Sequence, residues 1–231
     1  MWLKRLNTPR FWKQEPKKYK YSVNPSCGPH PKDYCIPLAI IVRDILKYAE
    51  NLKEAKQIIK QRKVLVDQRV VTDYRFPCGL FDVISFPEIN EHYRITANKY
   101  GLYLIKIKED EANLKIVKVK RKTKISNDTY QLTFHDGKNI LTKNNSIKTH
   151  DSLLIELPSF KILDHLKFEK NFLAFVFRGN NSGKIGKIVN ITEGGFNRAW
   201  LVEIEAENEK ISTIRDYVII VGKEDSLITL Q

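Results

Sequence analysis

The sequence predicts a β-rich α+β protein built from four parts. Three observations lead to this fold class. Residues 1–36 carry many cations and aromatic rings without sustained periodicity, helical periodicity is confined to the start of residues 37–97, and the later residues alternate apolar and polar side chains. We therefore expect a basic arm at 1–36, a helical hairpin with strands at 37–97, a small β-barrel or sheet at 98–170 and a second small barrel at 171–231.

The chain of 231 residues carries 40 Lys and Arg against 27 Asp and Glu, a formal net charge of +13. This excess favours a polyanionic partner, which could be nucleic acid or an anionic membrane surface. No apolar run approaches the roughly 20 residues that span a bilayer, and the opening MWLKR lacks the apolar stretch of a signal peptide. We therefore expect a cytoplasmic protein without a membrane partner.

The arm at residues 1–36 mixes cations with aromatic side chains, and its five prolines prevent a regular helix. Such a mixture suits irregular RNA, because cations meet phosphates and rings stack on unpaired bases. A disordered, solubilising tail is the alternative, but such tails are poor in aromatic residues. An arm ordered by a partner is therefore favoured. Its candidate RNA-binding residues are Lys4, Arg5, Arg10, Trp12, Lys13, Lys17, Lys18, Lys20 and His30.

Apolar residues recur at helical spacing between Ile40 and Ala49, which predicts a first helix after Pro37. Asn51 followed by Glu54 three residues later is typical of the start of a second helix. One face of that helix is apolar, and the other carries cations with Glu54 as the one acid, which favours phosphate contacts. The candidate RNA-binding residues of this part are Arg43, Lys53, Lys56, Lys60, Arg62, Lys63 and Arg69.

Strands and turns follow this helix pair. Val64 and Val66 alternate, Asp67-Gln68 turns the chain, and Val70-Val71 returns it. Further along, QLTFHDGKNIL predicts a hairpin with a type I′ turn at Asp136-Gly137. The remaining predicted strands begin at Leu102 and include residues 116–119, 152–157, 172–177, 184–191 and 218–221.

The stretch GNNSGKIGKI, residues 179–188, looks at first like a loop that binds nucleotide phosphates. That motif needs four residues between its first two glycines and a hydroxyl after the lysine, whereas here Gly179 and Gly183 are too close and Ile185 follows Lys184. The following residues alternate as a strand, so no helix N-terminus is available for phosphate. We predict instead a turn whose glycines allow a close approach to RNA, with Arg178, Lys184 and Lys187 beside it.

Catalytic and metal-binding patterns are weak. Cys27, His30 and Cys35 could supply three zinc ligands, with Cys78 or His92 as a distant fourth, but the paired spacing of structural zinc sites is missing. Reduced thiols without a metal or cofactor are the expectation. The remaining histidines, His92, His135, His150 and His165, have no convergent nucleophile or carboxylate, so we expect surface or phosphate contacts, no small-molecule substrate and no enzyme.

The run from Ile41 to Phe86 resembles the S4 RNA-binding domain. The matching residues are Arg43-Asp44, Glu54-Ala55, Ile58-Ile59, Arg62-Lys63, Val64, Val66, Val70, Pro77, Gly79 and Asp82-Val83-Ile84. Gln68 departs from the family pattern, which often has glycine in this hairpin turn. Gly179, Gly183, Ile185, Gly186 and Ile188, with residues 218–221, are similar to the KOW module, which implies an SH3-like barrel at 171–231.

The opening LKRLNTPRFW and the segment SCGPHP at residues 26–31 resemble the small-subunit ribosomal protein S4e family of archaea and eukaryotes, which combines these parts in this order. This resemblance implies a structural constituent of the small ribosomal subunit. The implied partners are small-subunit rRNA and neighbouring ribosomal proteins, and the implied place is the cytoplasmic ribosome. The alternative is a free RNA-binding factor, built from S4 and KOW modules, that acts in transcription or translation.

Overall fold

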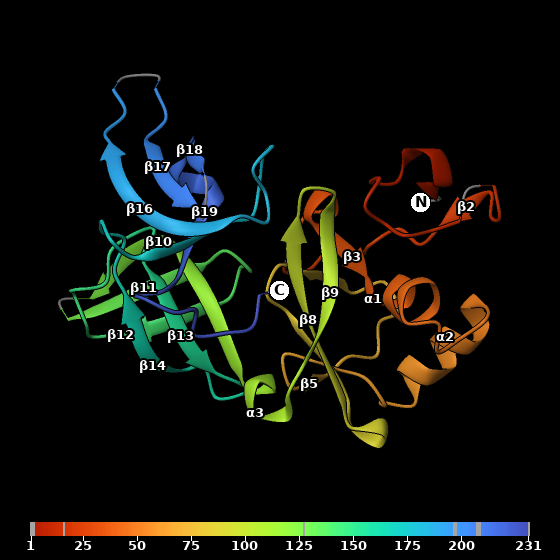
Figure 1. Cartoon of the computed structure of the whole chain (residues 1–231). Coiled ribbons are helices and arrows are strands. Elements are labelled where there is room, and N and C mark those ends of the chain that lie inside the picture. Colours follow the sequence, from red (N-terminus) through yellow and green to blue (C-terminus); the bar gives the residue numbers. More distant parts are fainter. Residues whose placement is uncertain (1–2, 16, 127, 196–197, 207–208, 231) are drawn as a thin grey trace. The chain divides into compact units, whose positions relative to one another are not determined.

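The computed structural model describes residues 3–15, 17–126, 128–195, 198–206 and 209–230. The chain forms two compact units, Met1–Thr96 with Tyr100–Asn113 and Ala97–Lys99 with Leu114–Gln231. Both are rich in strands and the helices are few and short, as expected for a β-rich α+β protein (Figure 1). Within the described ranges no helix is both long and apolar enough to cross a bilayer.

The arm is folded onto the first unit. Strand β1 (Leu3–Lys4) pairs antiparallel with β2 (Tyr21–Ser22), and 3-10 turns occupy Arg5–Asn7 and Lys32–Tyr34. Trp12 is 1% exposed, and its indole nitrogen donates a hydrogen bond to the Cys35 carbonyl at 2.7 Å. Contacts inside the unit therefore order the arm, which corrects the expectation that a partner orders it.

The helical part begins with α1 (Leu38–Ile40), continues as a π-helical turn at Ile41–Ile45, and resumes as α2 (Leu52–Lys60). The first helix ends earlier than the periodicity predicted, and Lys47 just beyond it has a φ of 59°, which no helix accommodates. The start of α2 is confirmed. The Asn51 side chain accepts hydrogen bonds from the backbone nitrogens of Lys53 and Glu54, and the Glu54 carboxylate reaches back to Glu50 N at 2.9 Å.

The first unit also contains a five-stranded sheet in the order β5-β4-β7-β8-β9 and a pair of β3 with β6. In the two-residue turn between β4 and β5, Asp67 and Gln68 have φ values of 50° and 59°, so the predicted turn is of the type I′ kind. Gln68 also donates a side-chain hydrogen bond to Ala112 O at 3.2 Å. The elements are β3 (Cys35–Pro37), β4 (Leu65–Val66), β5 (Arg69–Val70), β6 (Pro77–Gly79), β7 (Val83–Phe86), β8 (Glu91–Asn98), β9 (Gly101–Ile107) and α3 (Glu109–Ala112).

The second unit begins with a five-stranded sheet in the order β12-β11-β10-β13-β14. The predicted hairpin of β11 and β12 is confirmed, but the prediction that its turn is of type I′ is wrong. Gly137 has a φ of 76° while Asp136 does not reach positive φ, and the bond from Phe134 N to Lys138 O closes a longer loop. The strands are β10 (Leu114–Ser126), β11 (Thr129–Phe134), β12 (Asn139–Thr142), β13 (Ser152–Glu156) and β14 (Lys161–Leu166).

A second five-stranded sheet in this unit has the order β18-β17-β16-β15-β19. Its apolar core includes Ala174, Val176, Ile188, Val202 and Ile220, and Leu166 of the first sheet joins the same cluster. Both sheets of the unit therefore share a core. The strands are β15 (Leu173–Val176), β16 (Ile185–Thr192), β17 (Leu201–Ala206), β18 (Glu209–Ile214) and β19 (Val218–Gly222), with a 3-10 turn at Arg215–Tyr217 before β19.

Candidate nucleic-acid interface

The arm presents six exposed cations of those predicted to bind RNA: Lys4, Arg10, Lys13, Lys17, Lys18 and Lys20. Gln14 holds the segment that carries them. Its backbone carbonyl accepts a bond from Arg5 at 2.7 Å, its side-chain oxygen accepts one from Ser22 at 2.8 Å, and its amide nitrogen donates to Asp44 at 3.1 Å. The exposed cations are therefore displayed by a packed segment, with Lys18 partly engaged by Glu15 at 3.0 Å.

Arg43 is buried and serves the fold rather than a phosphate. Its guanidinium donates two hydrogen bonds to the carboxylate of Asp44, at 2.9 and 2.8 Å, and lies 4.7 Å from the centre of the Tyr19 ring. Since Gln14 binds the same carboxylate, the Arg-Asp pair links the helical part to the arm. This burial leaves the Arg43 guanidinium little surface for the RNA contact that was predicted.

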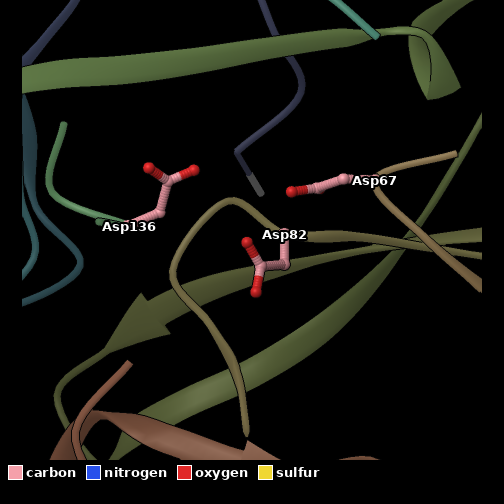
Figure 2. A group of neighbouring side chains, drawn as sticks. All are labelled: Asp67, Asp82 and Asp136. Atoms are coloured by element: carbon pink, nitrogen blue, oxygen red, sulfur yellow. The ribbon is translucent and has the colours of Figure 1, made fainter. Parts of the chain in front are cut away.

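His30 and Trp12 are also core residues, contrary to the prediction that they contact RNA. The His30 side chain is 5% exposed, and its Nε2 lies 3.1 Å from an Asp82 carboxylate oxygen. Figure 2 shows Asp82 on the loop that precedes β7, where its carboxylate also accepts a bond from Gly79 N at 2.8 Å. A Cβ on Gly79 would come within 2.3 Å of the His30 ring, so only glycine leaves room for it.

The basic side of α2 is formed by Lys53, Lys56 and Lys60, which repeat at intervals of three and four residues and therefore share one side of the helix. Lys53 and Lys60 are exposed, whereas the Lys56 ammonium lies 4.3 Å from the centre of the Tyr74 ring. Arg62 follows the helix with a φ of 63° and is exposed.

Two predicted cations beyond the helix differ in availability. Arg69 in β5 is exposed, but the Lys63 ammonium is paired with the Glu88 carboxylate at 2.9 Å. The first unit thus displays exposed cations on α2, just after it and on β5.

The turn at residues 179–183 is less suited to phosphate than the sequence predicted. Arg178 lies over the Tyr217 ring at 5.0 Å, Lys184 is paired with Glu209 at 2.5 Å, and Lys187 stands opposite Glu205 in the strand register. Gly179 and Gly183 have positive φ, as expected.

The close approach at this turn is to the chain itself. A Cβ on Gly183 would lie 2.8 Å from the Cα of Asn98, and one on Gly186 would lie 2.3 Å from the Glu205 carbonyl. These glycines therefore serve packing inside the second unit.

The net charge is unevenly distributed along the chain. Residues 1–36 carry eight cations and two acids, and residues 98–170 carry 15 cations and nine acids. Residues 171–231 carry seven cations and eight acids. The basic character therefore belongs to the arm and the central strands, and not to the last sheet.

Relatives of the chain identify its family. The protein is 43% identical over 223 residues to the small ribosomal subunit protein eS4 of Archaeoglobus fulgidus, an alignment that covers 96% of this chain and 94% of that protein. This chain belongs to the ribosomal protein S4e family. The S4e relative from Methanocaldococcus jannaschii is 41% identical, with 99% of this chain and 96% of the relative covered.

Three family descriptions match successive parts of this S4e chain. The RS4NT domain matches residues 2–33, the S4 domain matches residues 36–84, and the ribosomal family S4e matches residues 89–162. The crystal structure of the 30S ribosomal protein S4e from Thermoplasma acidophilum superposes with a TM-score of 0.73 at 32% identity, covering 85% of this chain and 100% of that one. The S4 resemblance read from residues 41–86 is thereby confirmed.

Sequence reasoning missed several buried polar contacts of this S4e chain. His92 is buried beside Ser85 at 2.8 Å, so it is not the surface contact that was expected, whereas the partly buried His165 has its Nε2 2.7 Å from an Asp151 oxygen. Burial, with the nearby charges of Lys118 and Arg215, lowers the pKa of His150 to about 4. The alternation of residues along the strand could have indicated that His92 is buried, but the spacing of residues could not have identified Ser85 as its partner.

Lys118 is the least expected of these groups. It lies on β10, is 5% exposed, and donates hydrogen bonds to the carbonyls of Arg215, Asp216 and Val218 at 2.9, 3.1 and 2.7 Å. Burial lowers the pKa of this ammonium to about 7, while the three acceptors favour its charged form. Lys118 therefore joins the two sheets of the second unit rather than facing solvent.

The cysteines are free thiols. Cys27 is exposed, whereas Cys35 and Cys78 are buried, and burial raises the pKa of Cys35 to about 12. Across the described residues no cysteine or histidine belongs to a group of three side chains close enough to share a metal ion. His30, one of the three weak candidate ligands, is engaged with Asp82.

Proposed function

We propose that this chain is a structural constituent of the small ribosomal subunit that binds small-subunit rRNA through basic surfaces. The observation that carries the proposal is its near full-length similarity to proteins named small ribosomal subunit protein eS4. These relatives form a family of ribosomal proteins, not of enzymes. The exposed cations of the arm and of α2 give the proposal a physical basis, because phosphate contacts dominate the affinity of proteins for nucleic acids.

In the proposed complex, the arm and the region of α2 contact the sugar-phosphate backbone, and the shape of folded rRNA supplies selectivity. The arm is already packed on its unit, so its cations meet RNA from a fixed surface. The proposed contacts are Lys4, Arg10, Lys13, Lys17, Lys18, Lys20, Lys53, Lys60, Arg62 and Arg69. Arg5, Lys56, Lys63, Arg178, Lys184 and Lys187 contribute less, since each is only partly exposed or lies against a ring or an acid.

The same proposal includes the division of the chain into domains. It divides the chain into an arm at 1–36, an S4-type domain at 37–97, a central β domain at 98–170 and a KOW-like, SH3-like domain at 171–231. The strand order of the last sheet and the positive φ of Gly179 and Gly183 support this division. Neighbouring ribosomal proteins are proposed as further partners, and the cytoplasmic ribosome as the location.

Sedimentation through a sucrose gradient tests the function. The tagged protein should travel with small subunits at low salt and leave them as salt rises. Recovery at the top of the gradient at low salt would instead favour the free RNA-binding factor. With about eight phosphate contacts, the slope of log K against log salt for small-subunit rRNA should be about −6 to −7, and a flat dependence would contradict binding through basic surfaces.

A further inference from the structure

Half of β10 forms, with β11 and β12, an exposed three-stranded ribbon that no predicted RNA contact includes. We call residues 119–126, 129–134 and 139–142 the β10–β12 ribbon. Thr123 lies opposite Gln131 and Gln131 opposite Leu141, while the pairing of β10 with β11 shifts register between Val119 and Arg121 and again between Lys124 and Ser126. Strand β12 is the free edge of its sheet, and β14 is the other edge (Figure 1).

The ribbon and the segment just after it are basic. Lys120, Arg121, Lys124 and Lys143 are exposed, and none of these four forms an ion pair with any residue that the structure describes. From residue 119 to residue 148 the sequence has two acids, Asp128 and Asp136. Asp136, labelled in Figure 2, is 1% exposed and bound to the buried Lys115 at 3.2 Å, so it does not offset the surface charge.

One face of the ribbon carries Arg121 beside exposed uncharged side chains, and Lys124 lies on the opposite face of β10. Arg121, Thr123 and Ile125 alternate along β10 and are all exposed, Ile125 by 57%. On the edge strand, Leu141 is 63% exposed. Cations interleaved with threonines and small apolar side chains can hold phosphates while contacting sugars and bases.

Lys122 behaves differently from its neighbours. Its ammonium donates to the carbonyls of Asn145 and Ile147 at 2.8 and 2.9 Å and lies 4.4 Å from the centre of the Tyr130 ring. It therefore fixes the segment that follows β12 against the ribbon. Lys120, Arg121, Lys124 and Lys143 lie near this anchored segment, and none of them forms an ion pair with a described residue.

We infer that the β10–β12 ribbon is an RNA-contacting surface that binds the phosphate backbone through Lys120, Arg121, Lys124 and Lys143. This inference rests on the proposed function and extends it to a part of the chain outside the arm and the S4-type domain. The charge favours RNA over a protein partner, because a surface with one exposed acid and four exposed cations that form no ion pair with a described residue matches a polyanion. The ribbon also lies in residues 98–170, where 15 cations face nine acids, an excess equal to that of the arm.

The experiment compares two full-length variants that each lose three cations in or just beyond the strands of the same sheet. The ribbon variant is Arg121→Gln, Lys124→Gln and Lys143→Gln. The control is Lys161→Gln, Lys167→Gln and Lys170→Gln, at and after β14 on the opposite edge, where all three side chains are also exposed. Both variants have equal net charge, so a difference between them reports position.

Binding to small-subunit rRNA transcribed from the same genome is measured by filter retention at several salt concentrations. The ribbon variant should bind about 10- to 100-fold more weakly at about 0.15 M salt, with a salt slope shallower by about 2 to 3. The control should stay within about threefold of the unmodified chain. Equal thermal unfolding of all three proteins shows that the variants fold.

The outcomes separate the two proposals. If the unmodified chain itself fails to bind, the proposed function fails. If it binds and the ribbon variant matches the control, the ribbon inference is overturned while the function stands. A ribbon variant that keeps full rRNA affinity but no longer enters reconstituted subunits would assign the surface to a protein neighbour and would also overturn the inference.

Discussion

The Nε2 atom of His30 lies 3.1 Å from the carboxylate of Asp82, and the same carboxylate binds the backbone nitrogen of Gly79. This contact joins the end of the arm to the loop that leads into β7. The ring occupies the space that a side chain at residue 79 would need. The glycine and the aspartate of the S4-type signature therefore have a common purpose, which is to hold the histidine of the preceding segment.

Replacing Gly79 with Ala should destabilise the protein by about 1–3 kcal/mol, because the added methyl group would overlap the His30 ring. Thermal or urea unfolding measures the loss. Gly195→Ala is the matched control, since a Cβ there meets nothing within 4 Å, and its stability should change by less than about 0.5 kcal/mol. Equal stability of the two variants would show that the histidine moves away at no cost.

Asp44→Ala should loosen the arm. The change removes the carboxylate that accepts hydrogen bonds from both Arg43 and Gln14. The loss of hydrogen bonds to a charged group costs about 1–2 kcal/mol. Trypsin should then cleave after Lys13 and its neighbours about 5- to 30-fold faster. As a control, Asp33→Ala removes an exposed acid of the arm and should leave the rate of trypsin cleavage unchanged. Unaltered cleavage in Asp44→Ala would mean that the other contacts of the arm, such as those of Trp12 and His30, secure it without Asp44.

Changing Lys53, Lys60 and Arg62 together to Gln should weaken binding to small-subunit rRNA by about tenfold or more without altering the unfolding temperature, because all three side chains are exposed. Filter binding measures the affinity for rRNA, and thermal unfolding measures the unfolding temperature. Lys63→Gln serves as comparison and should have a smaller effect, since Glu88 already holds that ammonium. Normal affinity in the triple variant would remove α2 from the interface.

Lys118→Met should destabilise the second unit by about 1–3 kcal/mol, since it leaves the buried carbonyls of residues 215, 216 and 218 without their donor. Urea unfolding detects the change. Lys120→Met, two residues along the same strand, alters an exposed side chain and should be nearly neutral. If both variants were equally stable, water would have to replace the ammonium.

Glu91 should make the first unit sensitive to acid. Its carboxylate accepts bonds from Lys106 at 2.6 Å and from Tyr48 and Tyr93, and these lower its pKa from 4.5 to about 2. A carboxyl with a lower pKa in the folded state than in the unfolded state stabilises the fold above pH 4.5, and this contribution is lost as the pH falls from about 4.5 to about 2.

The matching measurement is the unfolding temperature between pH 5 and pH 2. Glu91→Gln should show a shallower decline than the unmodified chain over that range. Glu88→Gln, at an exposed glutamate whose partner is Lys63, should decline as the unmodified chain does. Parallel curves for all three proteins would rule out the Glu91 cluster as the source of acid sensitivity.

Local chemistry made much of the fold predictable. The Asn51 cap, the turn at Asp67-Gln68 and the hairpin around Gly137 each depend on residues a few positions apart, and the sequence indicated all three. The first helix was overestimated because apolar spacing at Leu46 and Ala49 continues past the break at Lys47, where the chain adopts positive φ. Periodicity registers which side chains are apolar, not where the backbone leaves the helix.

The candidate site was predictable for exposed cations and unpredictable for residues with distant partners. Trp12 looked like a stacking platform because it lies among lysines, yet its acceptor is the carbonyl of Cys35. Arg43 looked like a phosphate ligand, yet it binds Asp44 and covers Tyr19. Sequence proximity to charge cannot reveal burial, which is decided by long-range packing.

The packing of the arm also sets an order of events during synthesis. The ribosome synthesises Trp12 and Gln14 well before their partners Cys35 and Asp44. The interval between His30 and its partner Asp82 is longer still. The earliest residues therefore remain unfolded on the translating ribosome until much of the S4-type region has been made, and only then can they close. Until residue 82 emerges, the cations of the arm therefore lie on an incompletely folded segment.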